Sequence, residues 1–121
     1  MKIEDLLITR IKISDEALAN CLAKVAAQIP NVSVGSMQVS CGDATVWLYR
    51  LSEADCWLEE EDIEKLTLVL GGEPKFFIQT QHNLTGNSDE LARQVQRELN
   101  DVCPVAFQFY DGRIGTLNRE D

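Results

Sequence analysis

Hydrophobic and polar residues alternate at the start of the chain in a way that is typical of a strand. Residues 6–13 (LLITRIKI) mix apolar and basic side chains with a period of two, and Ile and Thr favour extended backbone. Ser14 and the two acids after it form a helix-start signal. Apolar residues then recur at i, i+4 and i+8 over 17–29, which predicts an amphipathic helix that ends at Pro30.

The next segment shows the short period of β-structure on both sides of a turn. Three valines alternate with polar residues over 31–40, and 44–51 (ATVWLYRL) alternates in the same way. Residues 41–43 (CGD) have the composition of a turn, so the two runs predict a hairpin. Within the second run, Trp47 is expected in the core.

The middle of the chain carries a second helical pattern. Ser52 and Asp55 have the spacing of a capping box, and the apolar residues over 59–70 fit a helical period. Gly71-Gly72 would end such a helix. Residues 66–70 (LTLVL) also suit a strand, but the helix is the preferred interpretation.

The last third of the chain predicts a strand, a helix and a strand. Residues 75–81 (KFFIQTQ) read as a strand, and Asn87 gives a capping signal for a helix over 88–101. Residues 105–110 (VAFQFY) read as another strand. The Asp-Gly pair that follows, residues 111–112, is a strong signal for a tight hairpin turn.

Together these elements predict one α+β domain over residues 1–121, with 117–121 as a frayed tail. The expected order is β-α-β-β-α-β-α-β. It predicts a mixed or antiparallel sheet of about five strands with two or three helices. The first six elements have the order of a ferredoxin-like core.

The charge balance narrows the possible partners. Twenty acids and eleven bases give a net charge of −9 and a pI near 4.5. Such a chain repels nucleic acid and anionic membrane surfaces and attracts a basic partner. We find no signal-peptide pattern and no apolar run long enough to cross a bilayer, so the expected location is the cytoplasm.

Candidate chemistry is sparse in this sequence. The four cysteines match no zinc or CxxC spacing, and they read as reduced thiols, with Cys21 and Cys103 expected in the core. The single histidine, His82, is expected in a loop without a catalytic partner. We therefore expect a non-catalytic protein with neither a metal nor a cofactor.

One short stretch stands out against this background. Between Glu53 and Glu64 seven of twelve residues are acids, and no base interrupts them. The helix dipole accounts for two or three acids in a first turn, and the remainder repel one another. Trp57 lies among these acids, and one interpretation is that it is the aromatic anchor of a binding surface with a charged rim. The alternative is that Trp57 is a hydrophobic staple that packs the start of the helix onto the core. The candidate partner-binding residues are Asp55, Trp57, Glu59, Glu60, Glu61, Asp62 and Glu64.

Residues 71–112 (GGEPKFFIQTQHNLTGNSDELARQVQRELNDVCPVAFQFYDG) resemble the C-terminal half of some small immunity proteins of bacterial toxin systems. The shared features are a strand, a polar loop, an Asn-capped helix and a strand that ends in an acidic turn. The resemblance implies a monomeric protein that binds a cognate toxin domain and occludes its active site. The acids would then face basic residues of the toxin.

Two other functions remain open from the sequence. A type III secretion chaperone is also small, acidic and α+β, but it would be a homodimer with an exposed apolar groove. A ferredoxin-like domain that binds a small ligand would need a pocket with convergent polar groups, expected near His82 and Tyr110.

Overall fold

The computed structural model describes residues 2–117, and its element order follows the predicted alternation of strands and helices. The elements are β1 (Ile3–Thr9), α1 (Asp15–Gln28), β2 (Val32–Gly35), β3 (Gln38–Cys41), β4 (Ala44–Leu51), the short 3-10 helix η1 (Glu53–Cys56), α2 (Glu60–Leu70), β5 (Phe76–His82), α3 (Ser88–Asn100), β6 (Val105–Gln108) and β7 (Ile114–Gly115). The predicted α+β class is therefore confirmed, with three α-helices in the described part of the chain.

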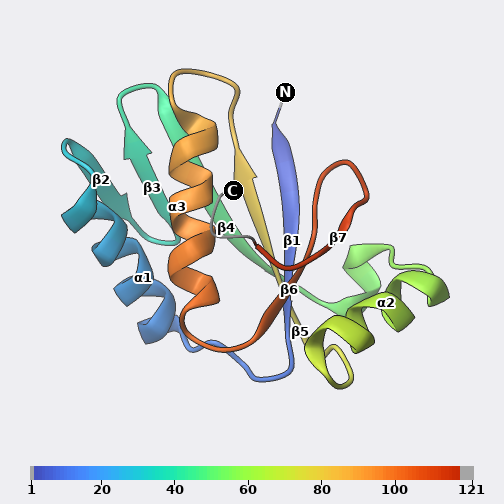
Figure 1. Ribbon diagram of the computed structural model, residues 1–121. Coiled ribbons are helices and arrows are strands. Elements are labelled where there is room, and N and C mark those ends of the chain that lie inside the picture. Colours follow the sequence, from blue (N-terminus) through green and yellow to red (C-terminus); the bar gives the residue numbers. More distant parts are fainter. Residues whose placement is uncertain (1, 118–121) are drawn as a thin grey trace.

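All strands between residues 2 and 117 form one antiparallel sheet in the order β2-β3-β4-β5-β1-β6-β7 (Figure 1). It has seven strands, not about five. Residues 31–40 fold back on themselves as β2 and β3, because Met37 adopts a left-handed turn conformation with φ of 58°. The first six elements do not pair as expected either, because β5 lies between β1 and β4.

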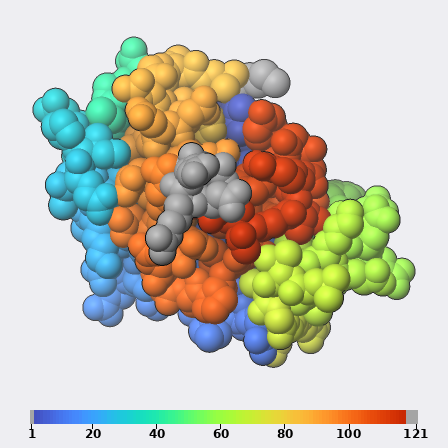
Figure 2. All heavy atoms as spheres, in the orientation of Figure 1, coloured from blue at the N-terminus to red at the C-terminus, as the bar shows by residue number. Residues whose placement is uncertain are grey.

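The helices cover the two faces of the sheet unequally. α1 and α3 lie side by side over one face, where the larger core forms around residues such as Leu7, Leu22 and Phe107 (Figure 1). α2 packs on the opposite face near β6 and β7, through buried Leu66 and Leu70. Burial of each leucine contributes roughly 2 kcal/mol, which holds α2 on the sheet. In space-filling view α2 projects from the side of the molecule (Figure 2).

The start of α1 and the end of α2 follow the sequence signals, whereas Ser52 and Asp55 do not cap α2, which begins at Glu60 after Glu59. The Ser14 hydroxyl accepts the backbone N–H of Ala17 at 3.1 Å, as expected for an N-cap. Residues 66–70 are helical, and α2 ends at Gly71, whose φ of 72° suits glycine. Asn87 precedes α3, but its side chain makes no capping hydrogen bond.

Some side chains lie elsewhere than the sequence predicts. Trp47 is only half-buried, because it points to the sheet face opposite α1 and α3, where the Lys2 ammonium lies 4.3 Å from its ring centroid. Cys21 is buried as expected, whereas Cys103 is half-buried. Leu117 packs against the larger core; the rest of the predicted tail, 118–121, lies outside the described residues. Among residues 2–117, no helix has the length and apolar character needed to cross a membrane.

Candidate functional site

The acidic stretch from Glu53 to Glu64, called the acidic segment below, forms η1 and the start of α2 between neighbouring strands β4 and β5. The structure gathers the candidate residues on this one connection. Of the seven candidates only Asp62 is half-buried; the exposed ones are Asp55, Trp57, Glu59, Glu60, Glu61 and Glu64.

Trp57 is held away from the core by its backbone. Its φ and ψ of 53° and 38° are left-handed, and its side chain is 89% exposed. The staple interpretation of Trp57 is therefore wrong. The turn before it is fixed locally, because the Ser52 hydroxyl donates to Asp55 Oδ2 at 2.8 Å and the Cys56 thiol donates to the Ser52 carbonyl at 3.2 Å.

The Cys56 thiol lies beneath this turn and is a poor nucleophile. Burial, and then the negative charges of Asp55 and Glu53, raise its pKa to about 11. Because the thiolate is the reactive form, the thiol stays protonated near neutral pH.

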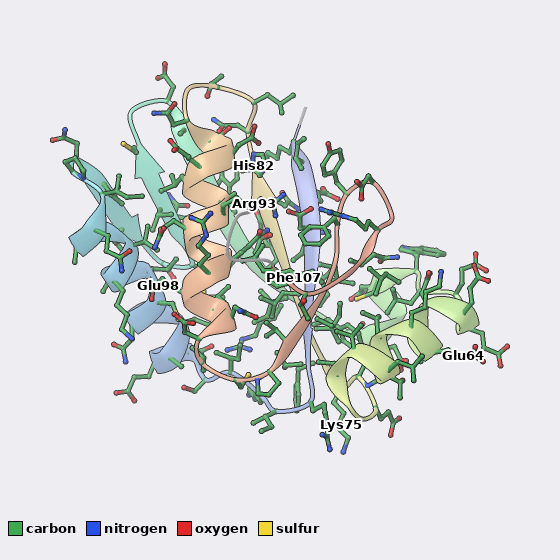
Figure 3. All side chains as sticks on the ribbon, in the orientation of Figure 1. Glu64, Lys75, His82, Arg93, Glu98 and Phe107 are labelled. Atoms are coloured by element: carbon green, nitrogen blue, oxygen red, sulfur yellow. The ribbon has the colours of Figure 1, made fainter. Side chains whose placement is uncertain are left out.

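Asp62 caps the start of α2, together with Glu59 of the same capping box. Its Oδ2 accepts the backbone N–H of Glu59 at 3.1 Å, as in a capping box, which explains why it is half-buried. Glu60 and Glu61 share the first turn of α2 but remain exposed. Glu64 lies one turn further along and points away from the sheet (Figure 3).

Within residues 2–117 no basic group lies within 4.0 Å of a carboxylate of the acidic segment. The contacts between basic and acidic side chains found there join Arg50 to Asp15 at 2.7 Å and His82 to Asp89 at 3.4 Å. Lys65 follows Glu61 by one helical turn, yet it forms no such contact. The segment thus presents its negative charge to solvent without internal neutralisation.

An open groove of about 360 Å³ runs along the sheet face beside η1. Asp55 lines it from η1, Trp57 from the position that caps the end of η1, and Tyr110 from the β6–β7 turn. Its floor is made by strand residues on the face opposite α1 and α3. We call this the sheet-face groove; its polar and aromatic lining residues include Glu4, Asp55, Trp57, Gln79, Gln108 and Tyr110.

Apart from Tyr110, which the sequence indicates only for a small-ligand pocket, sequence reasoning missed the groove residues outside the acidic segment. Glu4 and Gln79 belong to different strands, and their contact, with Gln79 Nε2 donating to Glu4 Oε2 at 3.3 Å, depends on the pairing of β1 with β5. A strand that begins at Ile3 would have placed Glu4 on the same face as Leu6. Tyr110 lies two residues before Gly112 in the hairpin turn and is 65% exposed.

A second hollow, of about 310 Å³, lies on the other side of the sheet at the N-terminal half of α3. We call it the polar pocket; it is lined by Asp5, His82, Asp89, Arg93, Gln96 and Tyr110, among others. His82 ends β5 and is only 4% exposed, with Nε2 3.4 Å from Asp89 Oδ1 and Nδ1 2.9 Å from the Asn83 carbonyl (Figure 3). The expectation that His82 lies in a loop is therefore wrong, since it is a buried strand residue that contacts Asp89 of α3.

A buried hydrogen-bond network forms the inner wall of the polar pocket. Gln96 is fully buried, and its Nε2 donates to Asp5 Oδ2 at 2.8 Å and to Thr80 Oγ1 at 3.0 Å. The backbone N–H of Tyr110 donates to Asp5 Oδ1 at 2.9 Å, and Arg93 Nη1 donates to Gln96 Oε1 at 2.9 Å. Both carboxylate oxygens of Asp5 are thus hydrogen-bonded inside the protein, as buried charge requires.

Comparisons of this chain with protein-family models, curated proteins and solved structures found no match. Among residues 2–117 no group of three or more His, Cys, Asp or Glu side chains is arranged to hold a metal ion.

Proposed function

We propose that this protein binds a basic protein partner through the acidic segment. The observation that carries the proposal is the exposed indole of Trp57 among carboxylates that no neighbouring base neutralises. Aromatic anchors surrounded by charged rims are typical of protein–protein interfaces.

The cost of this arrangement to the isolated chain supports a role in binding. Acids in the first turn of α2 gain roughly 0.3–1 kcal/mol each from the helix dipole, but Asp55 and Glu64 lie outside that turn. Like charges at helical spacing, such as Glu60 and Glu64, repel by similar amounts. Exposure of Trp57 contributes nothing to the core. A basic partner would turn both features into favourable contacts.

The class that best suits this proposal is the small immunity protein of a bacterial toxin system. Such a protein would act in the cytoplasm as a monomer, and it would occlude the basic active-site surface of a toxin domain. In this proposal the protein has no catalytic role, and the long-range field of its net charge of −9 speeds the encounter.

At the level of the fold, we propose a ferredoxin-like core with two insertions. The set β1, α1, β4, β5, α3 and β6 follows a β-α-β-β-α-β order, and its strands are arranged as β6-β1-β5-β4. The β2–β3 hairpin and the η1–α2 connection would then be insertions into this core. Each lies beside β4, one before it in the chain and one after it.

The resemblance to immunity proteins implies a dedicated partner encoded nearby. The direct test is therefore association kinetics with the product of the adjacent reading frame, measured by stopped-flow fluorescence at several salt concentrations. Glu60→Lys with Glu61→Lys should slow association at least tenfold at low salt, while dissociation changes little. Asp62 is spared because its carboxylate caps α2.

A matched control is provided by the first turns of the other two helices. Glu16 in α1 and Glu90 in α3 are exposed and occupy the same kind of position. Glu16→Lys with Glu90→Lys changes the net charge equally, from −9 to −5, and should slow association much less. Equal slowing by the two pairs would mean that overall charge acts and the acidic segment does not. No slowing by either pair would remove electrostatic recognition altogether.

A second candidate function is supported by the polar pocket. Groups of opposite charge converge there, with the Arg93 guanidinium near the His82–Asp89 pair and Tyr110 at the rim. That combination suits a small zwitterion such as a free amino acid, with its carboxylate on Arg93 and its ammonium on Asp89. Thermal-shift measurements with amino acids and with the matching amines test this; stabilisation that needs both charges and is lost in Arg93→Gln would favour it.

The chaperone alternative gains less support. The apolar positions of α3, including Leu91, Val95 and Leu99, pack inside this chain and are not free to form a dimer face. Sedimentation separates the alternatives, because the immunity proposal expects a monomer and the chaperone a dimer.

A further inference from the structure

We propose that the sheet-face groove receives an arginine side chain of the partner, held between the carboxylates of Glu4 and Asp55 and against the rings of Trp57 and Tyr110. This inference rests on the proposed function and deepens it, because it names the group by which the partner would be recognised. The size of the groove fits such a guest: about 360 Å³ lies at the lower end of the range for small-ligand sites, roughly 300–1,000 Å³.

The chemistry of the lining favours a cation. Glu4 and Asp55 both line the groove, and neither Lys nor Arg is among the described residues that do. Asp55 already accepts from Ser52 and Glu4 from Gln79, but each carboxylate can accept several hydrogen bonds. A guest that donates hydrogen bonds and carries positive charge would complement this lining.

The aromatic walls favour arginine over other cations. Trp57 is 89% exposed and Tyr110 is 65% exposed, and they approach the groove from two separate elements. A planar guanidinium can stack on such rings and still donate to carboxylates with its edge, whereas a lysine ammonium offers only a point charge.

Other aromatic rings of this protein are already in contact with cationic side chains of the chain itself, including Phe109, which also lines the groove. The Arg93 and Arg113 guanidinium carbons lie 5.1 Å and 4.5 Å from the ring centroid of Phe109. On the same sheet face as the groove, Lys2 covers Trp47 at 4.3 Å. Trp57 is therefore the tryptophan whose face remains open to a cation from outside the chain.

The test is a ¹H–¹⁵N NMR titration of the full chain with a short acetylated and amidated Gly-Arg-Gly peptide. The indole N–H of Trp57 and the groove amides should shift in a saturable way at millimolar peptide. The indole of Trp47, already covered by Lys2, serves as the internal reference and should shift much less. The same peptide with citrulline, which is neutral and nearly isosteric with arginine, should bind at least tenfold more weakly.

Two variant pairs separate the groove from general electrostatics. Glu4→Gln with Asp55→Asn removes two charges inside the groove, and affinity for the arginine peptide should fall at least tenfold. Glu61→Gln with Glu64→Gln removes two charges from the acidic segment outside the groove, and affinity should change less than twofold. Equal binding of the citrulline peptide, or equal losses in both pairs, would overturn the arginine site.

The two proposals fail in distinguishable ways. One outcome is that the arginine peptide fails to bind in the groove while Glu60→Lys with Glu61→Lys still slows association with the partner more than the control pair does. In that case the acidic segment remains the recognition surface, and only the groove assignment is lost. If the arginine peptide binds as expected but association with the partner is insensitive to those reversals, the proposed function is what fails.

Discussion

Replacing Gln96 with leucine tests the buried network that joins α3 to the sheet. The substitution keeps the size of a fully buried side chain and removes its amide. Asp5 Oδ2 then loses the donor 2.8 Å away, and Thr80 loses a partner at 3.0 Å. A hydrogen bond to a charged group contributes about 1.5–3 kcal/mol and a neutral one about 1 kcal/mol.

From these values we expect Gln96→Leu to lower the free energy of unfolding by about 3 kcal/mol. In a chain of this length that corresponds to a fall in Tm of roughly 10 °C. Chemical denaturation followed by circular dichroism measures the loss. Gln94→Leu is the matched control, because Gln94 lies on the same helix and bonds the surface residue Gln28, so we expect a change within about 0.5 kcal/mol.

A double-mutant cycle assigns the loss to the Asp5–Gln96 pair. Asp5→Ala and Gln96→Leu should show a coupling energy of at least about 1.5 kcal/mol, since the second substitution costs less once its partner is gone. The reasoning would be refuted if Gln96→Leu destabilised no more than Gln94→Leu, or if the two losses simply added.

Three further predictions concern the surface and the titrating groups. Trp57→Ala should change the free energy of unfolding by less than about 0.5 kcal/mol, because the side chain is 89% exposed, yet weaken partner binding at least tenfold; a large fall in Tm with binding intact would contradict this. The hydrogen bond from Arg50, and then its charge, lower the pKa of Asp15 from its ordinary value of 3.8. The native protein should therefore be more stable than Asp15→Asn above pH 3.8, and this difference should vanish as the pH falls below that value. A difference that persists at pH 2 in urea denaturation would count against the Arg50–Asp15 pair. Burial, followed by the charge of Asp55, raises the pKa of Cys56 to about 11, so at pH 8 native Cys56 should react with iodoacetamide roughly 100-fold more slowly than Cys56 of the unfolded chain. The contribution of this thiol to stability should turn unfavourable as the pH rises from about 9 through 11. Equal alkylation rates in the native and the unfolded chain would show that the thiol is not shielded.

Local signals in the sequence located most of the helices and strands. The period of α1, its Ser14 cap and the Gly71 stop of α2 act over a few residues, so they can be recognised without tertiary information. The prediction of a single strand over 31–40 was wrong. No strong turn signal marks Met37 in the sequence, yet Met37 adopts a positive φ at the turn. Strand order could not be derived locally, because the pairings of β1 with β5 and β6 join residues that are far apart in the chain, such as Thr9 and Phe76.

The residues of the candidate site also fall into two groups, those that local sequence reveals and those that only the fold brings together. The acidic segment is contiguous in the sequence, so its exposed carboxylates and Trp57 could be found by inspection. Glu4 and Tyr110 reach the sheet-face groove only through the pairing of β1 with β5 and β6. The contact between His82 and Asp89 could not be predicted, because Asp89 comes from the next helix and reaches His82 only when α3 folds back on the sheet.

The connection between β4 and β5 has a consequence for how this molecule could diversify. The chain leaves the sheet after Leu51 and returns at Phe76, and Leu51 stands directly opposite Phe77 in adjacent strands. The whole insert thus begins and ends at one spot on the scaffold, as a hairpin loop does. Its length and composition can be exchanged at a loop-closure cost that grows only slowly with length. A graft of residues 52–75 into another antiparallel hairpin would carry the acids and the indole with it, but it would leave Glu4 and Tyr110 behind.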